Sequence, residues 1–349
     1  MATIAVKKDL DLPSTLPAGY LSRPARMNDL EAVVETINAA TRDLIGADKY
    51  SLNDYKIEWE LPAFNLETDT RLVLAPDGQV AGIYEFWDLI TPHVRFAIWG
   101  RVHPAHEGRG VGSHLLAWAE QRALRSLEKS PPGARVVLQA FVPGIITNAD
   151  PLFAGHGFKL IRHSLRMVID LDAPPAAPNF PDGIKVRTMH TGEEARVLQA
   201  VRDSFRDHWG HVETPFEEDY QRWMHRIQND ERFDASLWFL AMADDQVAGI
   251  SLCWSRSFDD PDLGWVGTLG VRRPWRRQGL GLALLNHSFG EFYRRGISRV
   301  GLGVDAQNLT GALRLYTKAG MHSDPRFQHS IYEKELRPGV DLTTQSLED

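Results

Sequence analysis

The sequence predicts a mixed α/β (α+β) fold that is built twice along one chain. Strand-like and helix-like stretches follow each other in the same order in each half, and three landmarks recur at nearly constant spacing. Residues 77–83 reappear at 244–250, an offset of 167, and the glycines at 110 and 112 reappear at 279 and 281, an offset of 169. The pair Gly157-Phe158 corresponds to Gly320-Met321, an offset of 163. A repeat of this length is a whole domain and not a turn of a solenoid.

Each half is predicted to open with a short strand, a helical segment and a hairpin. The strands are expected at 20–23 and 184–187, and the helices at 30–44 and 193–205. The hairpins turn at Pro76-Asp77-Gly78 and at Asp244-Asp245, because these residue types favour turns between apolar runs.

The second half then shows a strand, a glycine-rich loop and a helix. After the apolar run 266–271, Leu282, Leu285, Phe289 and Phe292 recur at steps of three and four, which predicts a helix with one buried stripe. Gly296 is a plausible end for this helix. A strand at 300–304, a helix at 310–319 and a closing strand at 330–335 are expected to complete the half.

A proline-rich segment separates the two halves. Residues 172–183 contain four prolines in twelve positions, which is typical of a semi-extended linker. We therefore predict an N-terminal extension at 1–18, a first domain at 19–172, a linker at 173–183, a second domain at 184–337 and a C-terminal tail at 338–349.

The composition indicates a globular protein without a nucleic-acid or membrane partner. Hydrophobic residues make up 43% of the 349 residues and charged residues 24%. The net charge is −7 and no long basic run is present, which argues against binding a nucleic-acid backbone. The single cysteine, Cys253, lies in an apolar run and suggests a reducing compartment. Residues 1–14 lack a signal-peptide pattern and no segment has 18 consecutive apolar residues, so we expect a cytoplasmic location.

The most informative motif is a glycine loop that joins a strand to a helix. This second glycine loop is Arg276-Arg277-Gln278-Gly279-Leu280-Gly281, and a weaker copy, the first glycine loop, is Glu107-Gly108-Arg109-Gly110-Val111-Gly112. The start of a helix leaves backbone N–H groups without partners, and such groups bind phosphate. Both loops therefore predict a site for a nucleotide cofactor.

Two other phosphate-binding motifs fit this loop poorly. A dinucleotide fold needs a third glycine where the chain has Leu284 in one copy and Ser113 or His114 in the other. A nucleotide-triphosphatase loop needs Gly-Lys-Ser/Thr, which Gly281-Leu282-Ala283 lacks. A dinucleotide-dependent oxidoreductase remains an alternative hypothesis, which a screen for binding of a nicotinamide cofactor would test.

The pattern Arg-x-x-Gly-x-Gly, preceded by Val271-x-x-Pro274, resembles the pyrophosphate loop of the GCN5-related N-acetyltransferases. The segment from Asn308 through Tyr316 to Gly320-Met321 is similar to the Asn-x₇-Tyr-x₃-Gly-Phe helix of that family. The resemblance covers both halves of the chain, and the family motifs are clearly matched in the second half. It implies two tandem domains of this family, each with a mixed, mostly antiparallel sheet flanked by helices, and acetyl-coenzyme A (acetyl-CoA) as the cofactor.

The resemblance also implies roles for residues of the second half. A backbone N–H on the strand at 269–271 would stabilise the tetrahedral oxyanion. Tyr316 would be the general acid, because a phenol and a thiol have pKa values of about 10 and about 8.5 and differ by only roughly 2 kcal/mol. The residues expected to bind coenzyme A are Leu269, Gly270, Val271, Arg276, Arg277, Gln278, Gly279, Leu280, Gly281, Leu282 and Asn308.

The first half departs from the family pattern. Glu107 stands where Arg or Gln is expected and would repel a pyrophosphate, although Arg109 would partly offset it. Phe153 stands at the tyrosine position and cannot donate a proton, and the asparagine position falls near Ile145 and is not matched. We therefore predict that this half is catalytically inactive. Its ability to bind coenzyme A is left open.

A polar segment in the second half is the candidate acceptor pocket. His208, Trp209, His211 and Glu213 lie between two expected helices, where a histidine or the glutamate would act as a base directly or through water. The alternative is a loop anchored by Trp209. His208-x-x-His211 has zinc-like spacing, as has His103-x-x-His106, but no further ligands lie nearby in the sequence, so we expect no metal.

These features predict an acetyl-CoA-dependent N-acetyltransferase that acts on a primary amine of a small molecule by direct attack in the second domain. The tandem layout is similar to that of mycothiol synthases, so acetylation of a Cys-amino-sugar is an alternative. Trp265 stands where those enzymes place a catalytic glutamate. A coenzyme A-binding sensor without turnover is a further alternative. The sequence identifies neither the amine nor the oligomeric state.

Overall fold

The computed structural model describes residues 16–143, 149–257, 259–308 and 310–346. The first half contains strands β1 (Leu21–Arg23), β2 (Thr70–Leu74), β3 (Val80–Trp87), β4 (Arg95–Val102), β5 (Val136–Pro143) and β6 (Lys159–Asp170), with helices α1 (Leu30–Ile45), α2 (Leu52–Trp59), α3 (Leu66–Asp69), α4 (Val111–Ser126) and α5 (Ala149–Gly155). The second half contains strands β7 (Ile184–Thr188), β8 (Trp238–Ala243), β9 (Gln246–Trp254), β10 (Gly264–Val271), β11 (Arg299–Asp305) and β12 (His322–Arg337), with helices α6 (Glu194–Phe205), α7 (Phe216–Asn229), α8 (Leu280–Arg294) and α9 (Ala312–Lys318). The corresponding element order in the two halves confirms the mixed α/β fold made twice.

The described strands form one continuous sheet in the order β1-β2-β3-β4-β5-β12-β6-β11-β10-β9-β8-β7. Neighbouring strands are antiparallel except for two pairs, β4 with β5 and β10 with β11, which are parallel. Each half therefore has the predicted mixed, mostly antiparallel sheet. The parallel pair of each half lies where the strand before the glycine loop meets the strand after the long helix.

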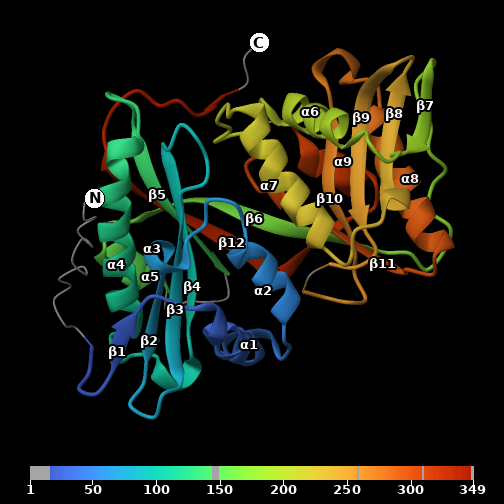
Figure 1. Ribbon diagram of the computed structural model, residues 1–349. Helices are drawn as coiled ribbons and strands as arrows, with labels where there is room; N and C mark the ends of the chain where they lie inside the picture. Colours follow the sequence, from blue (N-terminus) through green and yellow to red (C-terminus); the bar gives the residue numbers. More distant parts are fainter. Residues whose placement is uncertain (1–15, 144–148, 258, 309, 347–349) are drawn as a thin grey trace.

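The two halves exchange their last strands. β6, which ends the first half in the chain, pairs with β11 from Arg299↔Asp170 to Asp305↔Ser164. β12, which ends the second half, pairs with β5, for example at Ile331↔Phe141, and also with β6. The two exchanged strands run side by side through the centre of the molecule (Figure 1). Separating the halves would break both ladders, so they form one hydrogen-bonded body.

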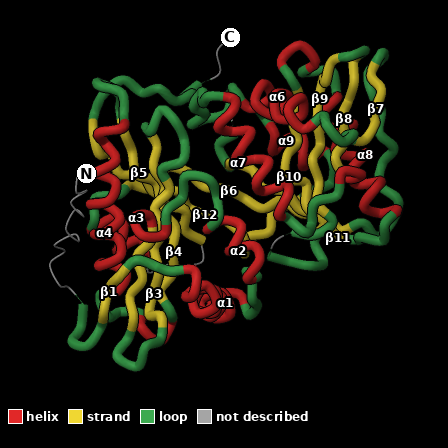
Figure 2. The backbone as a smooth tube through the Cα atoms, viewed as in Figure 1, coloured by secondary structure: helices red, strands yellow, loops and turns green. Residues whose placement is uncertain are grey.

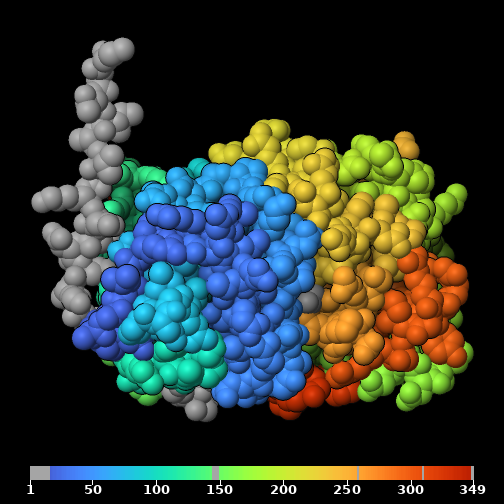
Figure 3. Space-filling model, turned by 60° about the horizontal axis from the view of Figure 1, so that its bottom comes forward, coloured from blue at the N-terminus to red at the C-terminus, as the bar shows by residue number. Residues whose placement is uncertain are grey.

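Helices cover both faces of the sheet in each half (Figure 2). In the first half, α4 and α5 pack over a core that includes Phe86, Phe96 and Leu115, while α1 and α2 cover the other face. In the second half, α8 and α9 cover one face and α6 and α7 the other. The two halves lie against each other (Figure 3), and α2 and α7 meet across the junction, where His225 Nε2 lies 3.0 Å from Ile57 O.

Two sequence expectations need correction in the second half. Leu285, Phe289 and Phe292 form the buried stripe of α8 as predicted, but Leu282 is only half-buried because Leu280 and Leu284 face the core instead. The closing strand is also longer than 330–335, since β12 pairs with a strand on each side. Cys253 is fully buried, as expected. In the described part of the chain, no helix combines the length and the apolar character needed to cross a bilayer.

Candidate active site

The second glycine loop ends in a left-handed turn that opens helix α8. Arg277 has φ +62° and Gly279, the N-cap, has φ +83°, a conformation that suits glycine. The first helical hydrogen bond runs from Ala283 N to Gly279 O at 3.1 Å. The N–H groups of Leu280, Gly281 and Leu282 precede this bond and point away from the helix, which makes an anion site at the positive end of its dipole.

The guanidinium of Arg276 holds this loop to the end of α6. Its Nε donates to Val271 O at 2.9 Å, its Nη2 donates to Ser204 O at 3.0 Å, and its Nη1 pairs with Asp207. Arg273 also donates to Asp207, whose side chain is 4% exposed. Hydrogen bonds from Arg273 and then Arg276 lower the pKa of Asp207 to about 2. The side chain of Arg276 therefore has protein partners, and the other donors that the loop offers are its backbone amides and the exposed side chain of Arg277.

Tyr316 lies on α9 in the core between α9, α8 and the sheet, and only 8% of it is exposed. Among the residues that the structure describes, its hydroxyl has no hydrogen-bond partner. Burial raises the pKa of Tyr316 to about 12, so the phenol keeps its proton at neutral pH. The helix sits close to the first turn of α8, because a Cβ at Gly281 would lie 3.0 Å from Leu315 Cδ1. The helix that carries Tyr316 thus packs beside the glycine loop, and the phenol is protonated at neutral pH.

Asn308 caps the turn before α9. Its Oδ1 accepts from Thr310 N at 2.9 Å and from Ala312 N at 3.1 Å. This is the capping role that its residue type favours. The side-chain oxygen is used by the cap, so any contact with a cofactor would come from the Nδ2 group.

Strands β10 and β11 pair over a short distance and then separate. Their register contains two pairs, Gly264↔Val300 and Trp265↔Gly301. A bulge between Val266 and Thr268 follows, and the rest of β10 stays paired with β9 alone. The edge of residues 267–271 that faces β11 therefore has no strand partner in the described part of the chain. An opening of this kind offers backbone N–H groups to a carbonyl oxygen lying between the two strands.

The first glycine loop has the same backbone geometry as the second. Gly108 and Gly110 have φ +70° and +80°, and the first bond of α4 runs from His114 N to Gly110 O at 3.0 Å. This loop lines a cavity of about 510 Å³, which also reaches the strands at Tyr84 and Ile98. We call it the first-half cavity.

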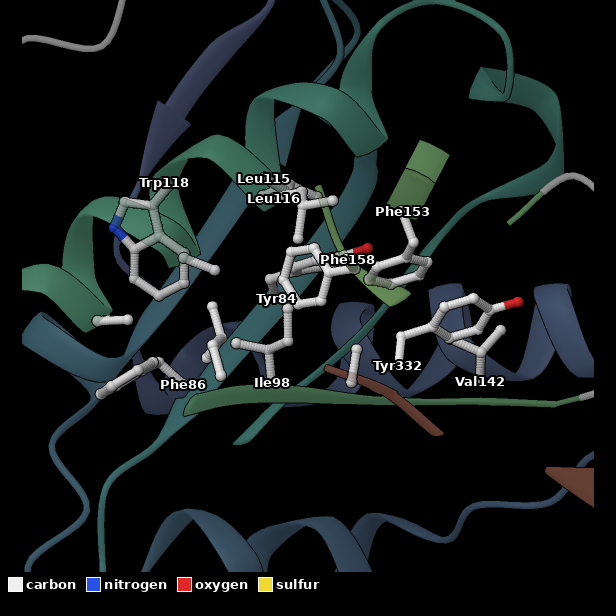
Figure 4. Close-up of a cluster of buried hydrophobic side chains, with 14 of the residues drawn as sticks. Tyr84, Phe86, Ile98, Leu115, Leu116, Trp118, Val142, Phe153, Phe158 and Tyr332 are labelled. Atoms are coloured by element: carbon white, nitrogen blue, oxygen red, sulfur yellow. The ribbon is translucent and has the colours of Figure 1, made fainter. Parts of the chain in front are cut away.

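Phe153 forms a wall of the first-half cavity at the position that corresponds to Tyr316. Its ring stacks on Tyr332 of the exchanged strand β12, with ring centroids 4.9 Å apart (Figure 4). Arg109 Nη1 lies 3.4 Å from the hydroxyl of Tyr20. The unmatched asparagine position near Ile145 lies outside the described residues.

The predicted acceptor residues do not all gather at one place. The His208 ring packs at a tilt of 52° against that of Phe205, with ring centroids 4.4 Å apart. Burial, followed by the charge of Arg276, lowers the pKa of His208. Trp209 lies under the guanidinium of Arg162, 4.1 Å from the ring centroid, and its Nε1 donates to Gln345. His211 and Glu213 are 3.4 Å apart, and Glu213 is exposed. Only His208 lies next to the Arg276–Asp207 pair, so it is the one of these side chains nearest the glycine loop.

The sequence analysis missed a cavity of about 240 Å³ between the halves. Its lining includes five charged or titratable side chains, Lys49, Arg101, Arg166, Asp259 and His329, together with Trp265. These residues come from segments that are far apart in the sequence. The sole sequence signal was Trp265, at the position where a glutamate was expected. Among the described residues, no group of three or more His, Cys, Asp or Glu side chains is arranged to hold a metal ion.

This fold and loop define an acyl-coenzyme A-dependent transferase, and comparison with known proteins identifies its family. The model of the acetyltransferase (GNAT) family matches residues 33–130 and 198–321. The chain therefore belongs to the GNAT family, with one matched region in each half. The match confirms the tandem organisation.

Individual relatives agree with this assignment. A mycothiol acetyltransferase from Thermobispora bispora is 31% identical over 225 residues, which cover 63% of this chain and 70% of the relative. A mycothiol acetyltransferase from Salinispora arenicola is 28% identical over 319 residues, or 88% of this chain and 95% of the relative. The crystal structure of a GCN5-related N-acetyltransferase from Sphaerobacter thermophilus matches with a TM-score of 0.76 and 34% identity, covering 95% of this chain and all of that one (100%). The chain is an acetyl-CoA-dependent N-acetyltransferase.

Proposed function

We propose that the second half transfers the acetyl group to a primary amine of a small molecule, with Tyr316 as the general acid. The observation that carries this proposal is the buried phenol of Tyr316 on α9, a helix that packs beside the second glycine loop, in a half that also has the opening between β10 and β11. The first half has a comparable loop but presents Phe153 at the corresponding position. A proton donor at this position is therefore found in the second half alone.

The second glycine loop binds the pyrophosphate through backbone N–H groups of Gly279, Leu280, Gly281 and neighbouring residues. Arg276 acts by holding the loop against Asp207 and the end of α6. The opening between β10 and β11 would receive the thioester end of the cofactor, and Leu269, Gly270 or Val271 would offer a backbone N–H to its carbonyl oxygen. Coenzyme A supplies an activated acetyl group and a thiolate leaving group.

The transfer requires a base at the amine and an acid at the leaving thiolate. The amine nitrogen attacks the thioester carbon, a C–N bond forms and the C–S bond breaks. Burial raises the pKa of Tyr316 to about 12, so its phenol is protonated when the thiolate forms and is the proton donor of our proposal. The same shift makes the transfer to the thiolate less balanced than the ordinary pKa values of a phenol and a thiol predict. His208, whose pKa is lowered, is neutral at pH 7 and is our candidate to accept the proton of the amine, directly or through water.

The first half binds coenzyme A without catalysing transfer. The first glycine loop keeps the positive-φ glycines and the free start of α4, and the first-half cavity of about 510 Å³ adjoins it. Phe153 has no hydroxyl to protonate a thiolate. A second bound cofactor would therefore support the fold and take no part in chemistry.

The replacement Tyr316→Phe tests the assigned acid. We expect kcat to fall about 10²- to 10⁴-fold, the usual contribution of general acid–base catalysis, with little change in the affinity for acetyl-CoA. Tyr293→Phe is the matched control, because Tyr293 is a partly exposed tyrosine on α8 outside the core. Unchanged turnover in Tyr316→Phe would refute the role of Tyr316.

A panel of amines with labelled acetyl-CoA tests the acceptor class. Transfer to a small primary amine is expected. The resemblance to mycothiol synthases, with which the names of the relatives agree, makes a Cys-amino-sugar one member of the panel. Cofactor binding without transfer to any member would favour the sensor hypothesis, and transfer to protein amines alone would contradict a small-molecule acceptor.

A further inference from the structure

The cavity between the halves, here called the inter-half cavity, is lined by the buried Arg166 and by the partly buried Lys49 and Arg101. It has a volume of about 240 Å³ and lies between α1 and the following loop, the exchanged strands β6 and β12, and the loop before β10. Three cations that line it are Lys49, Arg101 and Arg166, while the carboxylate on its wall is that of Asp259. Arg326 also lines it but pairs with Asp324 at 2.8 Å.

Arg166 is the best-placed ligand donor of this cavity. It is 7% exposed, and its Nη2 donates to Asp259 at 2.5 Å. Its Nη1 is buried and has no hydrogen-bond partner among the described residues. The guanidinium lies 3.9 Å from the ring centroid of Phe327 and 5.2 Å from that of Trp265, so the two rings fix its position. A buried N–H group without an acceptor is costly, and a ligand oxygen would satisfy it.

The other charged groups leave an excess of positive charge. Lys49 Nζ lies 3.1 Å from Asp259, which it shares with Arg166. The Nε of Arg101 is buried and likewise lacks a partner within the described part of the chain. His329 also lines the cavity, and burial together with Lys49, Arg101 and Arg166 lowers its pKa to about 4. One carboxylate therefore faces three cations and a neutral histidine.

The inter-half cavity reaches the reaction centre from the face opposite α8 and α9. Trp265 is the last residue of β10 that pairs with β11, immediately before the opening. Leu302 and Val304 of β11 face the α8 core, so Gly303 between them faces the cavity. Arg166 pairs with Gly303 in the sheet. A molecule held by Arg166 would thus lie beside the place where the thioester is proposed to sit.

We propose that the acceptor amine carries an oxyanion of its own, a carboxylate or a phosphate, that binds Arg166 with support from Lys49 and Arg101 in the inter-half cavity. This inference rests on the proposed function of the second half and specifies its substrate class. The amine end points into the opening between β10 and β11, loses its proton and attacks the acetyl carbon, while the oxyanion end stays on the guanidinium. A Cys-amino-sugar without an acidic group would lack this contact.

Pairs of amines that differ in the acidic group test the proposal. 2-Aminoethyl phosphate is compared with ethanolamine, and an α-amino acid with its amide. We expect kcat/KM to be at least about ten-fold higher for the anionic member of one pair, as a charge-assisted hydrogen bond provides. Equal rates within both pairs would overturn the inference.

Two single variants separate ligand binding from a structural role. Arg166→Gln removes the donor, so the ratio of kcat/KM between the anionic and the neutral amine is expected to fall close to one. Asp259→Asn removes the competing carboxylate, so this ratio is expected to increase. Arg299→Gln is the control, because it removes an arginine of the neighbouring strand β11 that pairs with Asp324 outside the lining. If the Arg166–Asp259 ion pair had only a structural role, both variants would change the kcat/KM ratio in the same direction or leave it unchanged. Either result would show that the proposal is wrong.

Calorimetry with inorganic phosphate, in the absence of cofactor, makes the test independent of turnover. Phosphate binding that weakens about ten-fold or more in Arg166→Gln and strengthens in Asp259→Asn supports the oxyanion site. If such binding is found but no acetyl transfer is detected, the oxyanion site stands and only the proposed function fails. Acetyl transfer without any preference for anionic amines leaves the function standing and removes the oxyanion site. Melting curves and coenzyme A binding of each variant establish that it is folded.

Discussion

The contact between Gly281 and Leu315 allows a sharp test of how the glycine loop positions Tyr316. A Cβ added at Gly281 would lie 3.0 Å from Leu315 Cδ1, whereas carbon atoms normally pack at about 3.5 to 4.0 Å. Gly112, the corresponding residue of the first half, leaves more room, since its Cβ would lie 3.4 Å from Leu152 Cδ2. Alanine at either position gains a similar helix propensity. Comparing Gly281→Ala with Gly112→Ala therefore isolates the effect of the tight contact.

The expected loss of stability follows from the steric overlap between the added Cβ and Leu315. Leu315 must move by about 0.5 Å or more, and overpacking of this kind costs about 1 to 3 kcal/mol. The lower end is expected, because the clashing atom is the end of a flexible side chain. A cost of about 1 kcal/mol lowers the melting temperature of Gly281→Ala by roughly 1 to 2 °C relative to Gly112→Ala, because the two halves of the 349-residue chain form one body. Since Leu315 precedes Tyr316, the same shift should reduce kcat about ten-fold.

The assay combines thermal unfolding with steady-state kinetics on one amine. In the double variant Gly281→Ala/Leu315→Ala the clash is removed, so kcat should recover most of the loss. Full activity in Gly281→Ala, or no recovery in the double variant, would refute the idea that this contact sets the position of Tyr316. Equal losses in Gly281→Ala and Gly112→Ala would refute it as well.

Two further predictions concern the loop anchor and the first half. The pKa of Asp207 is lowered to about 2, so its ion pairs contribute about 2 kcal/mol above pH ~4, and this part is lost as the pH falls towards 2. Urea unfolding of Asp207→Asn should show a smaller loss of stability between pH 6 and pH 3 than the parent chain, and an equal loss would contradict the assignment. Gly110 has φ +80°, where a β-branched residue is strained, so Gly110→Val should remove one of two coenzyme A equivalents in calorimetry and leave kcat unchanged. A stoichiometry of one in the parent chain would contradict a second cofactor site.

The sequence predicted the repeated elements because their signals are local. The spacing of Leu285, Phe289 and Phe292 depends on a few turns of one helix, and the glycine loop depends on six adjacent residues. Leu282 was misplaced because a helix has more apolar positions than one stripe can bury, and packing with the sheet decided in favour of Leu284.

The contacts that complete the site could not be read from local patterns. Arg276 was expected to contact phosphate, but its guanidinium binds Asp207, 69 residues away in the chain. Arg166, Asp259 and Lys49 look like surface residues in the sequence, and their burial depends on how two halves meet. The sequence of β6 alone does not show whether this strand pairs within its own half or with β11 of the other half.

The strand exchange gives a physical reason for keeping the first half, even though we predict that it is catalytically inactive. Arg166 lies on β6, a strand from the first half of the chain, but it pairs with Gly303 of the second half. Lys49 follows α1 of the first half and meets Asp259 of the second. A second half cut out of the chain would keep Tyr316 and its glycine loop yet lose Arg166, Lys49 and the strand that covers β11. The first half would therefore supply part of the proposed acceptor site, independently of the proposed binding of coenzyme A by its own loop.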